Sequence, residues 1–252
     1  AAARPQLVGE PYRLKAENRD IMLVIDISPS MLQPDLSRTQ RIDRLTAVKA
    51  VVGSFVQKRT EDRLGLILFG TRAYVQSLTF DKNAVAEILN NADAGMAGNS
   101  TSIGDALGLA LKNLREEKEK NNKVIILLTD GENNDGSLSM AQAIGLAEKE
   151  GIKIYTVGVG SDRNFLGSLF GLGNGELDEK SLKELAQKTK GNYFRATDVN
   201  SLAEIYTKID QLEPAKSEGN IVQEKKDLFY IPLTFALILA LFLLFLPGRY
   251  LK

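Results

Sequence analysis

The sequence predicts an α/β fold, in which a doubly wound, mostly parallel sheet carries helices on both faces and a C-terminal transmembrane helix follows. One observation predicts the sheet: short apolar runs alternate with amphipathic stretches between Asp20 and Leu212. Such an alternation favours right-handed crossovers between parallel strands. A second observation, the uncharged run from Leu228 to Leu246, predicts the membrane helix.

Each predicted strand is a short apolar run, which is typical of a parallel strand buried on both faces. The first strand reads IMLVIDI, and the fourth, VIILLT, is the most apolar. The third is expected to pair with the second as an edge hairpin. The predicted strands are Ile21–Ile27, Arg63–Phe69, Ala73–Leu78, Val124–Thr129, Ile152–Val159 and Tyr193–Ala196.

The predicted helices carry apolar residues at the spacing of one helical face. In the first helix these include Ile42, Leu45 and Val48, and Gly151 is a good C-terminal stop for the fourth. The glycine-containing stretch Ser161–Asp178 has no periodicity and is predicted to be a long loop. The predicted helices are Arg41–Lys58, Lys82–Asn90, Ile103–Lys118, Ser139–Glu150, Glu179–Thr189 and Ser201–Leu212.

The C-terminal apolar run predicts a membrane anchor. Roughly 19 residues without charge, at about 1.5 Å each, span about 28 Å, close to a bilayer core. Tyr230 and Tyr250 flank the run as interfacial aromatics. A buried core helix is the alternative, but such a helix is rarely apolar on every face. The expected organisation is an N-terminal membrane-proximal segment (1–19), the α/β domain (20–212), a polar, irregular juxtamembrane linker (213–227), the transmembrane helix (228–247) and a short tail (248–252).

Composition excludes several classes of function. Lys plus Arg and Asp plus Glu both number 32, so the basic excess of a nucleic-acid binder is missing. The chain has no Cys and no His, which excludes thiolate chemistry, a Ser-His-Asp triad and most zinc sites. An enzyme would have to use carboxylates and a hard metal ion.

Five oxygen-bearing residues are predicted to meet where the strands end. Ligands bind outside the carboxyl ends of strands in open parallel sheets. Asp26, Ser28 and Ser30 leave the first strand as D-x-S-x-S, Asp130 follows the fourth strand, and Thr101 lies in a polar loop that opens a helix. Hard oxygen donors favour Mg²⁺ in octahedral geometry, with Mn²⁺ or Ca²⁺ as alternatives.

Some polar residues at these strand ends also have an ordinary structural interpretation. Thr101 or Ser102 could cap the helix from Ile103, and Asp105 fits a first-turn partner of the helix dipole better than a metal ligand. Asp26 and Asp130, at adjacent strand ends, are expected to repel each other without a cation. The metal site is favoured because the residues occur together, at the right strand ends and in the right order.

This set of residues resembles the metal-ion-dependent adhesion site of von Willebrand factor A (VWA) domains: D-x-S-x-S, a distant Thr and a strand-ending Thr-Asp-Gly. The resemblance implies hydroxyl ligands from Ser28, Ser30 and Thr101, with Asp26 and Asp130 acting directly or through waters. It also implies an open position on the metal, which an Asp or Glu of a partner protein completes. Gly is commoner in the family where Pro29 stands here.

A narrower resemblance is to the Bat aerotolerance-type bacterial membrane VWA proteins. It rests on ARPQ near the start, DIMLVIDIS, TSIGDAL, LLTDGENN and YFRATD. The resemblance implies hydrophobic helices upstream, of which Ala1–Ala3 would be the tail, and a periplasm-facing domain at the inner membrane. It further implies an assembly role with other VWA membrane proteins and a MoxR-type ATPase.

Three hypotheses for function follow, of which a metal-dependent binding module without catalytic residues is favoured. The second is a metal-dependent phosphoester hydrolase that uses Asp26 as nucleophile or base. Such an enzyme would want a second carboxylate two residues on, where Ser28 stands. The third is a metal-free structural membrane scaffold, which a metal titration separates from the first.

Overall fold

The computed structural model describes residues 6–8, 12–13, 19–37, 41–116, 122–131, 133–161, 178–214, 221–222, 225–228 and 230–245. The chain divides into two compact units, one of residues 17–216 and one of residues 1–16 with 217–252. The predicted loop Ser161–Asp178 falls almost entirely outside the described residues.

A six-stranded sheet forms the centre of the larger unit, with strand order β5-β4-β3-β6-β7-β8. All neighbouring strands are parallel except β4 and β5, which form the predicted antiparallel edge hairpin. The prediction of a mostly parallel, doubly wound sheet is therefore confirmed. The strands are β3 (Arg19–Asp26), β4 (Arg63–Phe69), β5 (Ala73–Thr79), β6 (Asn122–Thr129), β7 (Lys153–Val159) and β8 (Tyr193–Ala196).

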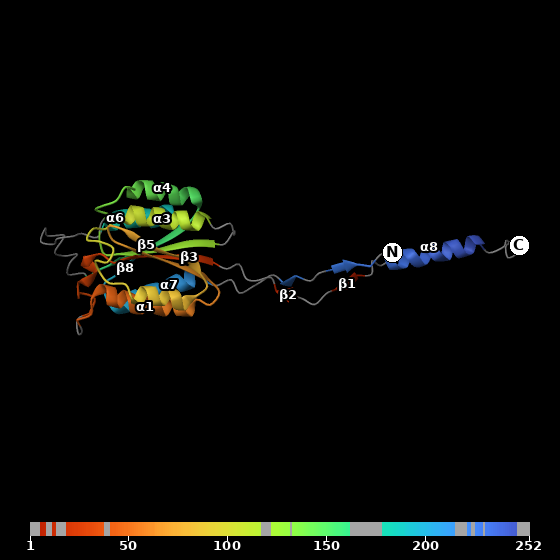
Figure 1. The fold of residues 1–252 in the computed structure, drawn as a ribbon, viewed down its shortest axis with the longest axis horizontal. Coiled ribbons are helices and arrows are strands. Elements are labelled where there is room, and N and C mark those ends of the chain that lie inside the picture. Colours follow the sequence, from red (N-terminus) through yellow and green to blue (C-terminus); the bar gives the residue numbers. More distant parts are fainter. Residues whose placement is uncertain are drawn as a thin grey trace. The chain divides into compact units, whose positions relative to one another are not determined.

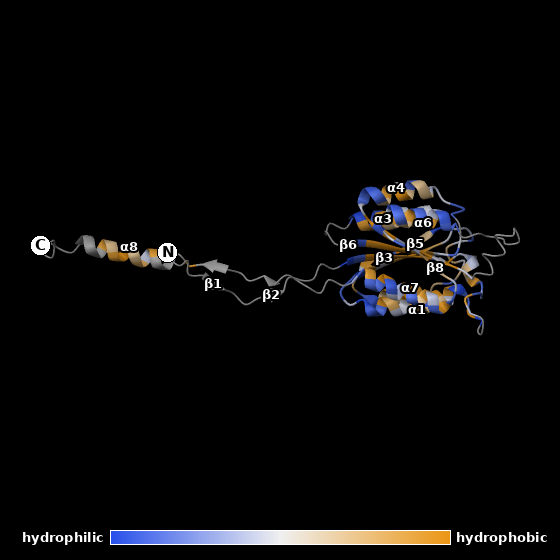
Figure 2. Ribbon diagram, turned by 180° about the vertical axis from the view of Figure 1, so that it is seen from behind, coloured by the Kyte–Doolittle hydropathy of each residue, from blue (hydrophilic) through white to orange (hydrophobic). Residues whose placement is uncertain are grey.

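Helices cover both faces of this sheet (Figure 1). One face packs against α1 (Arg44–Lys58), α2 (Lys82–Asn90) and α7 (Val199–Leu212). The other packs against α3 (Ile103–Glu116), α4 (Met140–Glu150) and α6 (Glu179–Lys188). Figure 2 shows the strands as a hydrophobic layer between helices that contain both hydrophilic and hydrophobic residues. Buried apolar side chains thus form one core on each face of the sheet.

Two helices begin at residues other than those predicted, and their capping residues explain why. The carboxylate of Asp43 accepts the Thr46 N–H at 2.6 Å, so α1 begins at Arg44 and not at Arg41. Asp198 caps α7 in the same way, through the N–H of Ser201. Aspartate stabilises a helix at this position because its side chain satisfies a backbone donor that the helix leaves unpaired.

In its described residues, the smaller unit contains short antiparallel strand pairs and the helix α8. β1 (Gln6–Val8) pairs with β10 (Lys225–Asp227), and β2 (Tyr12–Arg13) pairs with β9 (Ile221–Val222). The prediction of an irregular linker is wrong at the residues of β9 and β10. Their partners lie near the opposite end of the chain, and the local composition of a segment carries no signal of so distant a partner.

Helix α8 (Tyr230–Phe245) occupies 16 residues of the predicted transmembrane run. At about 1.5 Å per residue it rises about 24 Å. Within the described residues, no helix combines the length and the apolarity required of a membrane span. The structure therefore does not confirm the predicted transmembrane helix, whose ends fall partly on residues outside the description.

Candidate metal centre

Asp26 ends β3 next to β6, in the middle of the sheet. The two strands are parallel neighbours with Ile25 opposite Leu128. This register brings the Thr129 hydroxyl to Asp26, where it donates to Oδ2 at 2.6 Å. The backbone N–H of Ser28 donates to the other oxygen, Oδ1, at 2.8 Å. Both oxygens of the fully buried Asp26 carboxylate are therefore engaged.

A turn after β3 brings the two serines of D-x-S-x-S to Asp130. Pro29 begins the short 3-10 helix η1 (Pro29–Leu32), where its fixed backbone angle suits a helix start. The hydroxyls of Ser28 and Ser30 lie 2.9 Å apart, and Ser30 Oγ donates to Asp130 Oδ1 at 2.7 Å. Four of the five predicted residues thus form one continuous set of hydrogen bonds.

Thr101, the fifth predicted residue, lies beside the residue that follows Asp130. A β-carbon placed on Gly131 would lie 3.7 Å from Thr101 Oγ1. The Thr101 N–H donates to the side-chain oxygen of Asn134 at 2.9 Å. Thr101 is buried, yet its hydroxyl makes no hydrogen bond to any residue that the structure describes. The Thr101 hydroxyl thus lies beside Gly131, next to the end of β6 where Asp130 stands.

The alternative in which Thr101 or Ser102 caps α3 is not what the structure contains. The N–H of Gly104, in the first turn of α3, donates to the side-chain oxygen of Asn133 at 3.0 Å. Among the described residues, neither the Thr101 nor the Ser102 side chain accepts a hydrogen bond from this helix, although the Ser102 carbonyl accepts the Ala106 N–H at 3.1 Å. Asn133 and Asn134, which the sequence analysis did not single out, thus hold the Thr101 loop against the end of β6.

Burial makes this cluster costly to charge without a cation. It raises the pKa of Asp26 to about 6, and the negative charge of Asp130 adds to the rise against the hydrogen bonds of Ser28 and Thr129. Burial also raises the pKa of Asp130, although Arg44 works against the rise. Buried carboxylates of this kind take up either a proton or a cation.

A second charged group, which the sequence analysis missed, contacts the site. Arg44 Nη1 donates to Asp130 Oδ2 at 2.6 Å. Its Nε and Nη2 donate to the two oxygens of Asp35, at 2.8 and 2.6 Å. The expected repulsion between Asp26 and Asp130 is therefore partly compensated. One signal could have identified Arg44: a basic residue in the first turn of a helix is disfavoured by the helix dipole and calls for an acidic partner.

The family model of the von Willebrand factor type A domain matches residues 20–208, which is most of the chain. The chain belongs to the VWA domain family.

The relatives of this VWA protein include bacterial membrane proteins. The chain is 26% identical to the conserved hypothetical protein BatB from Bacteroides thetaiotaomicron, with a TM-score of 0.60, over 77% of this chain and 98% of that one. It is 25% identical to an aerotolerance-related membrane protein from Bacteroides fragilis, with a TM-score of 0.60, over 77% and 99%. An uncharacterized protein of Borreliella burgdorferi is 28% identical over 96% of this chain and 73% of its own length.

A more distant VWA structure contains a metal. Proximal thread matrix protein 1 from the mussel byssus was solved with a zinc-occupied MIDAS motif, that is, a metal-ion-dependent adhesion site. The present chain is 23% identical to it, with a TM-score of 0.58, over 82% of this chain and 48% of that one. At this identity the likeness establishes the shared fold.

In the described part of the VWA chain, no group of three or more His, Cys, Asp or Glu side chains is placed to hold an ion, and the candidate site is therefore built mainly from hydroxyls and two carboxylates. Asp105 lies in the first turn of α3, as predicted. Its carboxylate accepts the N–H groups of Ser137 and Leu138 at 2.9 and 2.7 Å. Asp105 therefore holds the loop before α4 and does not face the candidate site.

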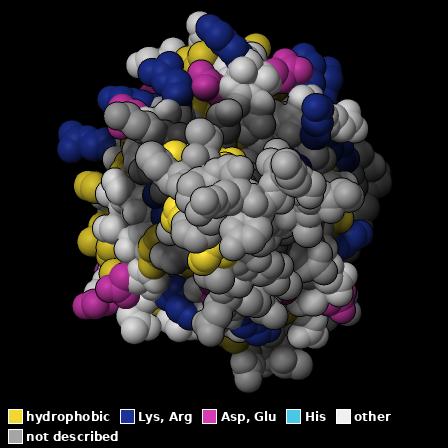
Figure 3. Space-filling view, turned by 90° about the vertical axis from the view of Figure 1, so that its right-hand side faces the viewer, with side chains coloured by type: hydrophobic (Ala, Val, Ile, Leu, Met, Phe, Trp, Pro, Cys, Tyr) yellow, Lys and Arg dark blue, Asp and Glu magenta, His cyan; other side chains and the backbone are white. Residues whose placement is uncertain are grey.

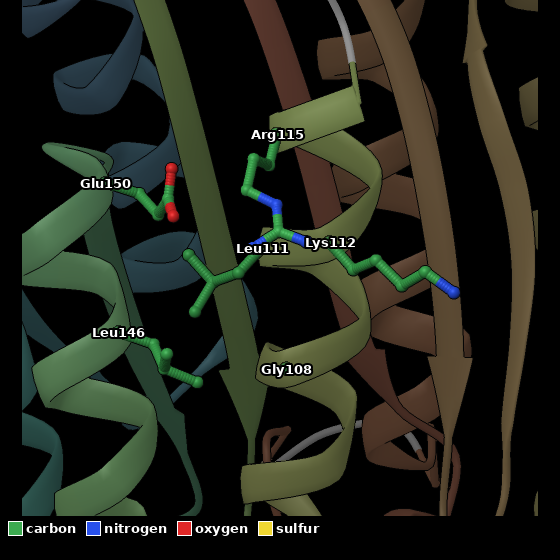
Figure 4. Close-up of a pocket in the computed structure, with 6 residues that line it drawn as sticks. All are labelled: Gly108, Leu111, Lys112, Arg115, Leu146 and Glu150. Atoms are coloured by element: carbon green, nitrogen blue, oxygen red, sulfur yellow. The ribbon is translucent and has the colours of Figure 1, made fainter.

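Away from the candidate site, the described part of the VWA unit has further surface features. A groove of about 220 Å³ between α3 and α4 has an apolar floor with charged side chains beside it (Figure 4). On the part of the face in Figure 3 that grey atoms do not cover, lysine and arginine side chains are interspersed with aspartate and glutamate. The groove is lined by Gly108, Leu111, Lys112, Arg115, Leu146 and Glu150.

Proposed function

We propose that this VWA protein binds one divalent cation and uses it to capture an aspartate or glutamate of a protein partner. The observation that carries the proposal is the hydrogen-bonded set Asp26–Ser28–Ser30–Asp130, with the Thr101 hydroxyl beside it. VWA domains are typically adhesion and interaction modules, and this role needs no catalytic residue.

The residues present fit a hard divalent ion. Ser28, Ser30 and Thr101 offer neutral hydroxyls, and Asp26 and Asp130 offer carboxylates whose burial favours a cation nearby. An oxygen-only set of this kind suits Mg²⁺ best, with Mn²⁺ and Ca²⁺ as alternatives. When bound, the ion would supply a positive centre that attracts a carboxylate. The zinc-occupied MIDAS motif of the mussel protein supports a divalent ion in this fold.

The cellular setting is part of the proposal. We infer a VWA domain of residues 20–212 that is held at the bacterial inner membrane by residues 228–247, through the linker 213–227, and faces the periplasm. The apolar side chains of α8 support the anchor, and so does the similarity to an aerotolerance-related membrane protein. The acidic partner would belong to an assembly or stress-tolerance complex with other VWA membrane proteins and a MoxR-type ATPase.

The geometry argues against the rival hydrolase. A nucleophile or general base needs an oxygen within reach of the substrate. Both oxygens of Asp26 are instead engaged by Ser28 and Thr129 below the surface. Ser28 also occupies the position where a second carboxylate would be expected.

A metal titration tests the proposed function and separates it from the metal-free scaffold. Mg²⁺ or Mn²⁺ should raise the melting temperature of the protein, because a ligand that binds only the folded state stabilises it. The rise should disappear in Ser30→Ala, which loses one hydroxyl, and persist in Ser137→Ala, a nearby exposed serine outside the site. Partners retained from solubilised membranes in Mg²⁺ should be released by EDTA. If neither ion changes the melting temperature, the proposal is contradicted.

A further inference from the structure

The guanidinium of Arg44 is built into the candidate metal site and not merely close to it. Arg44 is 4% exposed, and its Nη1 donates to Asp130 Oδ2 at 2.6 Å, while Ser30 occupies Oδ1 of the same carboxylate. One oxygen of Asp130 is thus committed to Arg44, and the other accepts the Ser30 hydroxyl. A bidentate approach of Asp130 to an ion at the serines is blocked as long as Arg44 stays in place.

The surroundings of Arg44 hold it there from several sides. The guanidinium makes a two-pronged contact with Asp35, the strong geometry for an arginine–carboxylate pair. Asp35 also accepts the N–H of Ser161 at 3.0 Å. Burial opposes the charge on Asp35, but the hydrogen bonds from Arg44 and Ser161 hold the pKa of Asp35 below its usual value. Asp35 therefore keeps its negative charge and fixes the orientation of Arg44.

The backbone after β7 leaves room for this arrangement. Gly160 has a φ of 149°, which disfavours a residue with a side chain. A β-carbon at Gly160 would lie 3.2 Å from Arg44 Nη2. The strand end thus closes around the guanidinium, and three segments of the fold (η1 with its following loop, α1 and the end of β7) meet at one cationic side chain.

We propose that Arg44 is a positioning residue that acts through Asp130 to set the charge of the metal site, so that the ion is held weakly and keeps attraction for an outside carboxylate. The inference rests on the proposed metal-binding function and specifies how that site is regulated. A guanidinium next to the site repels a dication directly, and it also withdraws one Asp130 oxygen from ligation. Both effects lower the affinity for the metal ion in the protein as built.

The test is the affinity of the full chain, purified in detergent, for Mn²⁺ alone, measured by calorimetry or electron paramagnetic resonance. Arg44→Met removes the positive charge and should raise Mn²⁺ affinity about tenfold, since a like charge a few ångströms away is removed. A purely structural role predicts the opposite, because a loosened Asp130 would bind the ion less well.

Arg44→Lys is the matched control and the safeguard if Arg44→Met does not fold, which circular dichroism checks. Lysine keeps the charge but loses the two-pronged geometry. The inference predicts Mn²⁺ affinity within about threefold of the parent, since the like charge near the ion is unchanged. A structural role predicts a large loss.

The outcomes separate this inference from the proposed function. A parent chain that binds no Mn²⁺ overturns both. If the parent binds Mn²⁺ but Arg44→Met binds it more weakly, the role of Arg44 is overturned and the metal site stands. The same holds if Arg44→Lys loses more than about tenfold in Mn²⁺ affinity, which is the size of the expected charge effect.

Discussion

The two ends of the central strands both bury charged side chains, but they balance them differently. At the end where β3 begins, Arg19 donates to both oxygens of Asp62 at 3.2 and 3.1 Å, and Arg59 contacts the same carboxylate at 3.0 Å. Next to them, Arg63 donates to both oxygens of Asp20 at 2.8 and 2.9 Å. Each buried acid at this end has an arginine partner.

At the end where β3 stops, the balance is negative. Asp26, Asp130 and Asp35 lie near one another, and Arg44 is the basic side chain that contacts two of them. A compensated cluster holds a fold together, whereas a cluster with surplus buried negative charge attracts a cation. Burial of charge alone therefore does not identify a site, whereas a net buried negative charge without an arginine partner does.

Asp62→Ala should have the largest effect on stability, because it leaves the buried Arg19 and Arg59 without their shared carboxylate. Breaking a buried ion pair on one side costs about 3 to 5 kcal/mol. Urea denaturation in EDTA measures this loss. Asp210→Ala, which removes a half-exposed partner of Arg59, is the control and should cost less than about 1 kcal/mol. A loss in Asp62→Ala as small as that in Asp210→Ala would mean that the buried ion pairs at this end contribute little to stability.

The stability of the metal-free protein should depend on pH because of the buried carboxylate of Asp26. Asp26 has a pKa of about 6 in the folded state against an ordinary value of 3.8. Because the folded pKa is the higher one, the contribution of Asp26 to stability is fully present below about pH 4 and is lost as pH rises through 6. The loss approaches about 3 kcal/mol.

The measurement is the free energy of unfolding in EDTA between pH 4 and 7, for the parent and for Asp26→Asn. The asparagine variant should lose less stability over this range, since it has no carboxyl proton to release. Mg²⁺ should flatten the parent curve at neutral pH by compensating the ionised carboxylate. Parallel curves for parent and variant would show that Asp26 titrates normally.

Asp130→Ala should destabilise the metal-free domain by about 2 kcal/mol. The loss leaves one side of the buried Arg44 unpaired, and an uncompensated buried charge is costly. The cost is moderated because Asp35 still pairs with Arg44 and because the repulsion between Asp26 and Asp130 disappears. Thermal melts in EDTA and in Mg²⁺ measure both effects, and the metal-induced rise should vanish. A variant more stable than the parent in EDTA would mean that the repulsion outweighs the Arg44 pair.

Local patterns in the sequence predicted most of the fold and the five candidate site residues. Apolar runs identify strands whatever their partners are, and D-x-S-x-S followed by a distant Thr-Asp-Gly is a linear signal. Contacts between distant residues are different. Arg44 meets Asp130 across 86 positions, and β9 and β10 pair with strands at the other end of the chain. Nothing in the composition around these residues specifies such partners, so the pairings emerge only from the packed structure.

Thr101→Ala should have the smallest effect on stability and still abolish the metal response. The Thr101 hydroxyl makes no hydrogen bond within the described structure, and the loop is held by the Thr101 backbone, which bonds to the side chain and the backbone of Asn134. The metal-free protein should therefore lose less than about 1 kcal/mol, which is below the usual loss for removing a helix cap. In Mg²⁺, however, one neutral oxygen is missing from a shell that requires near-octahedral geometry.

The decisive comparison is between Thr101→Ala and Asn134→Ala, which disturbs the same loop and keeps the hydroxyl. Melting curves in EDTA should rank Asn134→Ala as the less stable variant, because the buried N–H of Thr101 loses its acceptor. In Mg²⁺, the melting temperature of Asn134→Ala should still rise, whereas that of Thr101→Ala should not. If Thr101→Ala responds to Mg²⁺ as the parent does, the hydroxyl is not a ligand and the site has four protein residues, not five.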